Sequence, residues 1–102
     1  MITSTANVQV KELVRLMKKS RARDEAGVFI VEGPRMVGEL TGDPSWCGHI
    51  RKVYLSESYA AKYPSETEEL KKICRTELLA DPVFDHVSGT KTPQGILAVA
   101  ER

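Results

Sequence analysis

The chain has 102 residues, the size of one domain rather than two. Its 15 lysines and arginines stand against 14 aspartates and glutamates, so the formal net charge is only +1. Hydrophobic residues make up 41% of the chain, which is enough apolar surface to build a core and excludes disorder as the main state.

Membrane and secreted proteins are disfavoured as well. Cys47 and Cys74 are the only cysteines, and one isolated pair indicates reduced thiols rather than a disulfide framework. No apolar run approaches the roughly 18 residues that cross a bilayer, and the N-terminus shows no export signal. We therefore expect a cytoplasmic protein.

The first predicted element is an amphipathic helix that follows Asn7, a residue favoured at the N-cap. Apolar residues recur along it at helical spacing, at Val10, Leu13, Val14 and Met17. This stripe should face the core.

Basic charge is concentrated between residues 11 and 23. With one acidic residue, this segment carries +5 while the other 89 residues sum to −4, and its basic members are Lys11, Arg15, Lys18, Lys19, Arg21 and Arg23. The first three share one helix face by their spacing. Such a ridge indicates a polyanion partner, because lysine and arginine neutralise phosphates; a solvated helix face is the alternative.

Val28–Val31 is a continuous apolar run, which predicts a strand buried on both faces. Glu32 and Gly33 end it, and a helix should begin at Pro34 with an apolar side of Met36, Val37 and Leu40. Arg35 then follows the carboxyl end of a strand, where open α/β sheets bind ligands. It is a second candidate for anion binding, with an exposed first-turn arginine as the alternative.

The middle of the chain predicts a loop, a strand and two helices. Gly42, Pro44 and Gly48 mark the loop, and a strand with uneven spacing follows at Ile50, Val53 and Leu55. Ser56 should cap a short helix around Tyr59–Lys62. The stretch 65–68 has capping-box spacing, and the next helix should bury Leu70, Ile73 and Cys74.

The last third predicts strand, helix, turn and strand. Glu77–Ala80 is the third strand, and Asp81 is expected to cap a helix that buries Val83, Phe84 and Val87. Turn residues 92–95 lead into Ile96–Ala100, a wholly apolar strand that should be central. The alternation predicts an α/β fold, a three-layer α/β/α sandwich around a mixed, mostly parallel four-stranded sheet.

Catalytic motifs are missing from this pattern. Cys47 and His49 would supply only two metal ligands where a structural zinc site needs four, so we predict no metal site. No glycine-rich phosphate-binding motif occurs. Aromatic residues are not interleaved with the basic segment, so we expect no stacking platform there. The residues favour a binding domain over a complete enzyme.

Stretches at both ends of the chain carry a family pattern. They are Ile2-Thr3-Ser4, Asn7, Val10-Lys11 with Leu13 and Leu16, Lys18–Arg23, Gly27–Gly33 and Arg35, then Asp81–Phe84 and Thr90–Val99. In this order they resemble the N-terminal substrate-binding domain of the TrmH/SpoU family of RNA 2′-O-ribose methyltransferases. The resemblance covers almost the whole chain, although Val8 stands where the family often has proline.

The resemblance implies that residues 1–102 form an RNA substrate-binding domain, with a fold similar to small ribosomal and kink-turn-binding proteins. In the family, a knotted catalytic domain binds S-adenosylmethionine, dimerises and methylates a ribose of tRNA or 23S rRNA. That domain would begin after Arg102, and its signatures are not found here. No catalytic residue and no cofactor site are therefore assigned to this chain.

With the resemblance added, nine residues are predicted to contact RNA: Lys11, Arg15, Lys18, Lys19, Arg21, Arg23, Glu32, Gly33 and Arg35. Two alternatives stay open. One is a free-standing RNA-binding protein of the ribosomal or kink-turn-binding type. The other is a protein-interaction module whose basic ridge meets an acidic partner.

Overall fold

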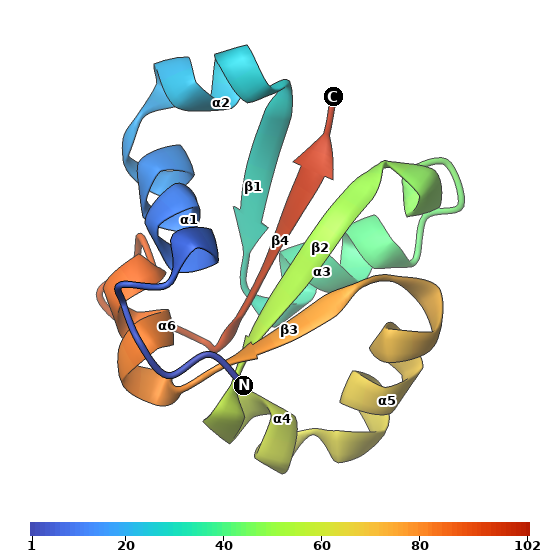
Figure 1. Cartoon of the computed structure of the whole chain (residues 1–102). Helices are drawn as coiled ribbons and strands as arrows, with labels where there is room; N and C mark the ends of the chain where they lie inside the picture. The colour runs from blue at the N-terminus through green and yellow to red at the C-terminus, as the bar shows by residue number, and fades with distance from the viewer.

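The computed structural model describes the backbone of residues 1–102 and every side chain except that of Cys47. Four strands form one sheet (Figure 1): β1 (Val28–Glu32), β2 (Ile50–Ser56), β3 (Thr76–Leu79) and β4 (Ile96–Glu101). The helices are α1 (Val8–Lys18), α2 (Ser20–Ala26), α3 (Pro34–Thr41), α4 (Glu57–Lys62), α5 (Pro64–Ile73) and α6 (Asp81–Val87), with a 3₁₀ turn η1 (Cys47–His49). No helix in the described part of the chain combines the length and apolar character that crossing a membrane requires.

The sheet is mixed, as predicted, but the expected excess of parallel pairs is wrong. The strand order is β1-β4-β2-β3, and only β2 and β3 pair in parallel. Strand β4 lies between β1 and β2 and runs antiparallel to both. The reason is where β4 begins: Gly33 N donates to Ile96 O (2.9 Å) and Ser56 N to Gly95 O (2.8 Å), so β4 starts beside the ends of β1 and β2.

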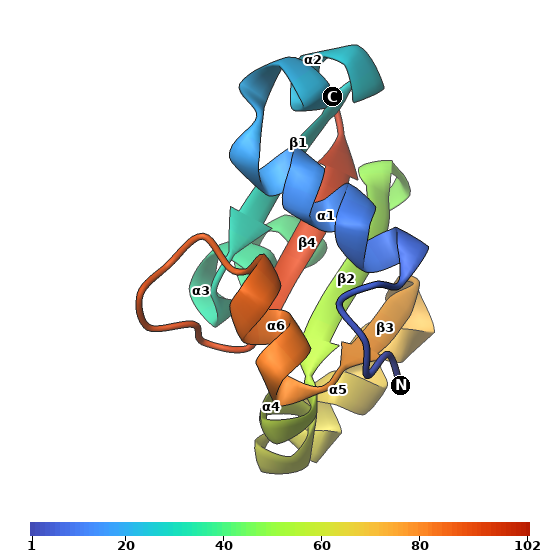
Figure 2. The ribbon, with the colours of Figure 1, turned by 60° about the vertical axis from the view of Figure 1, so that its left-hand side comes forward.

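Helices cover both faces of the sheet, which confirms the three layers. Figure 2 shows α1 and α6 in front of the strands and α3 and α5 behind them. In central β4, Leu97 and Val99 pack on the side of α1 and α6, whereas Ile96, Ala98 and Ala100 pack on the side of α3 and α5. All five are buried, so the prediction of a central apolar strand is confirmed.

Strand β1 lies at an edge of the sheet, and the prediction that both of its faces are buried is confirmed in part. Val28 and Ile30 pack toward α1 and α6, whereas Phe29 and Val31 pack toward α3 and α5. Val28 is fully buried, but the other three side chains are only half-buried. The uneven apolar spacing in β2 also has a structural cause. A register shift between Ile50 and Lys52 indicates a β-bulge, and it puts the two parts of the strand out of phase.

The predicted helix starts are partly confirmed. Asn7 Oδ1 accepts from Gln9 N (2.8 Å) at the start of α1, and Ser56 Oγ accepts from Tyr59 N (3.0 Å) at the start of α4. The capping box at 65–68 is wrong, since α5 already begins at Pro64, whose ring is preorganised for a first turn.

Three further residues differ from expectation. Asp81 is the first residue of α6 rather than its N-cap, and its carboxylate accepts hydrogen bonds from Ser58 N and Oγ instead. Met36 and Ile73 were expected in the core, but each is 50% exposed. Both side chains lie on helix faces that point away from the sheet. The opposite face of α3 buries Val37 and Leu40 instead.

Candidate nucleic-acid interface

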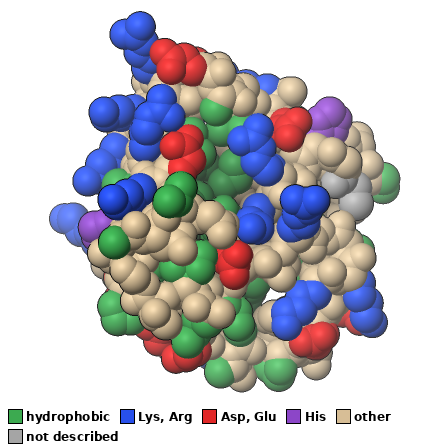
Figure 3. All heavy atoms as spheres, in the orientation of Figure 1, with side chains coloured by type: hydrophobic (Ala, Val, Ile, Leu, Met, Phe, Trp, Pro, Cys, Tyr) green, Lys and Arg blue, Asp and Glu red, His purple; other side chains and the backbone are tan. Residues whose placement is uncertain are grey.

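The basic segment is divided between two helices. The chain leaves helical geometry at Lys19 (φ −120°, ψ 110°), where α1 ends and α2 begins. Lys11, Arg15 and Lys18 lie on the exposed side of α1, as their spacing predicts, while Arg21 belongs to α2. Figure 3 shows Lys and Arg side chains gathered along the left side of the molecule, over α1 and α2.

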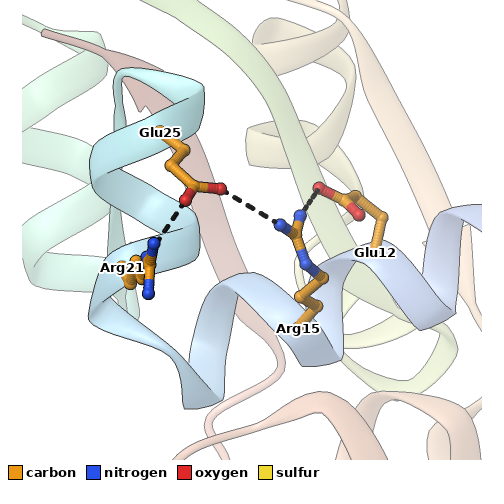
Figure 4. A network of polar contacts seen from close by, with 4 residues as sticks. All are labelled: Glu12, Arg15, Arg21 and Glu25. Carbon is orange, nitrogen blue, oxygen red and sulfur yellow. Dashed lines mark hydrogen bonds and ion pairs between the residues drawn. The ribbon is translucent and has the colours of Figure 1, made fainter.

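Two of the arginines belong to a network of ion pairs, in which the Arg15–Glu25 pair connects α1 to α2 (Figure 4). The Arg15 guanidinium lies 3.3 Å from Glu12 Oε1 and 3.6 Å from Glu25 Oε2, and Arg21 Nε lies 3.2 Å from Glu25 Oε1. All four side chains are exposed, so these pairs contribute little to stability. They orient Arg15 and Arg21, and a bound phosphate would have to compete with the carboxylates.

Arg23 has a structural task. Its Nη1 donates to the carbonyl oxygens of Leu16 (2.6 Å) and Met17 (3.1 Å) in the last turn of α1. Those carbonyls have few partners within the helix, and a cation at this end also complements the helix dipole. Arg23 therefore fixes α2 against the end of α1, whatever its contact with RNA.

Three lysines of the segment are open to a partner. The ammonium groups of Lys11, Lys18 and Lys19 are exposed and form no ion pair with any described residue. Arg35, at the start of α3, is also accessible: its side chain is 90% exposed and pairs only loosely with Glu39, at 3.6 Å. These four residues carry the most available positive charge of the predicted set.

Glu32 holds a loop rather than facing solvent. Its carboxylate accepts hydrogen bonds from Ser88 Oγ and from Gly89 N (3.3 Å). Both donors belong to loop 88–95, which connects α6 to β4. The carboxylate thus anchors this loop beside the end of β1, which makes Glu32 a positioning residue for the surface around it.

Two glycines allow the turn after β1 to pack against the turn before β4. Gly33 has φ +100°, and a Cβ there would lie 2.9 Å from Gln94 Oε1. Gly95 has φ +87°, and a Cβ there would lie 2.5 Å from Ser56 Oγ and 2.8 Å from Tyr59 Cβ. The two family-like stretches of the sequence, around Gly33 and around Gly95, are therefore packed against each other.

Loop 88–95 joins the two predicted parts of the surface. A Cβ on Gly89 would lie 2.9 Å from Met17 Cε, so this loop touches the last turn of α1, beside Lys18. In Figure 2 the loop projects next to the end of β1 and the start of α3. It also carries Lys91, an exposed cation that the sequence reasoning did not single out although it stands in a family-like stretch.

A cleft of about 520 Å³ adjoins this surface, and the sequence reasoning missed it. It lies among α4, α6, Pro34 and loop 88–95, with two tyrosines in its wall. The rings of Tyr59 and Tyr63 are 4.8 Å apart. Burial, and secondarily Tyr63, raise the pKa of Tyr59. The signal in the sequence was the four-residue spacing of these tyrosines, which sets them on one side of a helix.

The loop that contains Trp46 and Cys47 offers no candidate metal site among the described side chains. Trp46 packs edge-on against Phe29, with ring centroids 5.4 Å apart, which ties its loop to β1. Cys47, considered as a metal ligand, has a side chain outside the described set. Among the described side chains, no group of three or more His, Cys, Asp or Glu residues is arranged to hold a metal ion.

Residues 7–98 match the sequence profile of the MRM3-like substrate binding domain. A comparison with curated proteins found no match. An rRNA methyltransferase from Sinorhizobium meliloti has a similar structure, with a TM-score of 0.72 at 19% identity over 99% of this chain and 36% of that one.

Two other solved structures have the same fold. An RNA 2′-O ribose methyltransferase gives a TM-score of 0.72 at 26% identity, over 98% of this chain and 36% of that one. The SpoU methyltransferase AviRb from Streptomyces viridochromogenes, in complex with AdoMet, gives 0.73 at 21% identity, over 93% and 35%. The chain thus spans about a third of the length of these enzymes. Because the profile match extends over most of its residues, the chain belongs to the MRM3-like substrate binding domain family.

Proposed function

We propose that the chain binds structured RNA and presents it to a methyltransferase domain. The observation that carries this proposal is the set of exposed cations at the end of α1 and beside loop 88–95. Lysine and arginine in such positions neutralise phosphates and release counterions, which gives strong and salt-dependent affinity. The substrate-binding family of the profile match, together with the similarity to an rRNA methyltransferase and an RNA 2′-O ribose methyltransferase, supports RNA as the polyanion.

The nine predicted residues take two roles in this proposal. Phosphates are contacted by Lys11, Lys18, Lys19, Arg21 and Arg35. The remaining four shape the surface: Arg15 and Arg23 hold α1 against α2, while Glu32 and Gly33 hold loop 88–95. Phosphate contacts of this kind fix the register of the RNA but read no sequence.

The catalytic step belongs to a separate domain in this proposal. That domain would be the knotted one of the TrmH/SpoU family, acting as a homodimer, binding S-adenosylmethionine and methylating a ribose of 23S rRNA or tRNA. No residue of this chain is proposed to hold the methyl donor. Arg102 N donates to Gly27 O (3.0 Å) and its side chain pairs with Asp24 (3.0 Å), so a chain continuing from Arg102 would emerge beside α2. It would therefore start next to the basic surface.

An amide chemical-shift titration tests the proposal. The chain is titrated at two salt concentrations with a folded tRNA, with a 23S rRNA hairpin and with heparin as a control polyanion. We expect shifts gathered on residues 18–23, 32–35 and 88–92, larger for one RNA than for heparin. Equal, scattered shifts with heparin and both RNAs would contradict RNA recognition and favour a protein-interaction module.

A further inference from the structure

We propose that the cleft among α4, α6 and loop 88–95 binds one unpaired nucleobase of the RNA, stacked on the ring of Tyr63. This inference rests on the proposed function and adds a selectivity to it. A domain that needs a base turned into this cleft would prefer looped or single-stranded segments to continuous duplex.

Two tyrosine rings form an aromatic wall of the cleft, which favours stacking of a base. Tyr63 is 37% exposed, and its ring packs against that of Tyr59 at a centroid distance of 4.8 Å. Its partner is held more firmly, because Ser56 Oγ caps Tyr59 N and Gly95 packs on Tyr59 Cβ. One ring thus supports the other, and aromatic rings presented in this way are stacking platforms for bases of any sequence.

The cleft also has the size and polarity for a base. Its volume of about 520 Å³ lies in the range typical of small-ligand pockets. Gln94 lines it with an amide that forms no hydrogen bond to any described side chain or backbone group, so its NH₂ donors are available, while its Oε1 packs beside Gly33. Pro34 and Phe84 contribute apolar surface.

The charges in the cleft exclude a phosphate from its interior. Asp81 and Asp85 both line it, and Lys62 is the one cation among the lining residues. Hydrogen bonds from Ser58 lower the pKa of Asp81, so this carboxylate stays ionised at neutral pH. A neutral base with amino donors is compatible with carboxylate oxygens, whereas a phosphate is repelled by them.

Positively charged side chains around the opening of the cleft could contact the phosphates instead. Lys62 Nζ lies 5.5 Å from the centroid of the Tyr63 ring in an exposed cation–π contact. A base that stacks on this ring would displace the ammonium toward the phosphate of the same nucleotide. Arg35 follows Pro34 on one side of the cleft, and Lys91 lies on the loop that forms another side.

Two oligomers of equal charge test the inference. The chain is titrated with a single-stranded RNA pentanucleotide and with an abasic ribose-phosphate pentamer, while the ring protons of Tyr59 and Tyr63 are followed by NMR. We expect both rings to shift with the base-containing oligomer only. Tyr63→Ala should weaken binding of that oligomer about tenfold and leave the abasic one unchanged, because stacking on the ring is lost. Tyr63→Phe should bind both as the wild type does.

The outcomes separate this inference from the proposed function. If amides of residues 18–23 shift but the tyrosine rings do not, the cleft is not a base site and the RNA-binding proposal survives. If the abasic oligomer shifts the rings equally, the inference is also overturned. If no residue shifts with either oligomer or with folded RNA, both proposals fail. Lys72→Ala on α5, outside the residues that line the cleft, should change neither affinity and serves as a control variant.

Discussion

Arg23 and Lys18 belong to one basic segment but are used differently. The Arg23 guanidinium donates to two carbonyl oxygens of α1, at 2.6 and 3.1 Å, whereas the Lys18 ammonium forms no ion pair with any described residue. Replacement of Arg23 should therefore lower the stability of the fold, whereas replacement of Lys18 should weaken binding of a polyanion.

We predict that Arg23→Ala lowers the free energy of unfolding by about 1.5–3 kcal/mol, because charge-assisted hydrogen bonds to the end of α1 are lost. Lys18→Ala should stay within about 0.5 kcal/mol of the wild type, as an exposed substitution does. Urea denaturation measures both. Equal losses in the two variants would show that Arg23 does not have this structural role.

Asp81 carries a second prediction at this scale. Hydrogen bonds from the Ser58 side chain and backbone hold its pKa below the ordinary value of 3.8. A carboxyl group whose pKa is lower in the folded state stabilises that state above the unfolded pKa, and this contribution disappears as the pH falls through the folded pKa. The stability difference between wild type and Asp81→Asn should thus be constant from about pH 5 to 8 and shrink below about pH 4. Denaturation curves across this range check it; a difference that grew on acidification would contradict the sign.

At the scale of elements, the turn after β1 and the turn before β4 are built as one unit. Gly33 and Gly95 both have positive φ, and each approaches a side chain more closely than a Cβ would permit. Glu32 adds its hydrogen bonds to Ser88 and Gly89. These contacts fix loop 88–95 beside the start of α3. The loop lines the cleft there and also adjoins the basic surface.

We expect Gly95→Ala to destabilise the chain by about 1–3 kcal/mol from the strained φ alone, with a further cost from overlap with Ser56. Gly38→Ala is the matched control, since Gly38 lies inside α3 and no atom beyond its chain neighbours and the backbone of its own helix lies within 4 Å of its Cβ position. Alanine there should stabilise by about 0.5–1 kcal/mol. Thermal unfolding measures both, and a neutral Gly95→Ala would show that the loop relaxes freely.

Local features of these elements were predictable from the sequence, and long-range ones were not. Caps at Asn7 and Ser56 depend on residues that are neighbours in the chain, and the apolar run of β4 identified it as central. The direction of β4 was not predicted, because it depends on where loop 88–95 brings the chain back to the sheet. The loop ends beside the carboxyl ends of β1 and β2, and no local sequence pattern encodes that contact. The cleft was missed because Tyr63, Asp85 and Gln94 come from three separate segments.

At the scale of the whole molecule, the small net charge conceals two different sides. The side of α1 and α2 carries lysines without ion-pair partners among the described residues, whereas on α5 Lys71 and Lys72 are paired with Glu68 and Glu69 at 3.3 and 3.0 Å. A polyanion should therefore approach from the side of α1, the side that also holds the C-terminal residue Arg102 beside α2.

The salt dependence of RNA binding shows whether the basic surface at the end of α1 contacts phosphates. The dissociation constant of a folded RNA is measured over a series of salt concentrations for the wild type, for Lys18→Ala/Lys19→Ala and for the control Lys71→Ala/Lys72→Ala, which removes the same charge from α5. We expect the first variant to flatten the slope of log K against log salt by about 1 to 2, since each lysine releases counterions from one phosphate. The control should keep the wild-type slope. Equal slopes in all three proteins would contradict the claim that the surface at the end of α1 binds RNA.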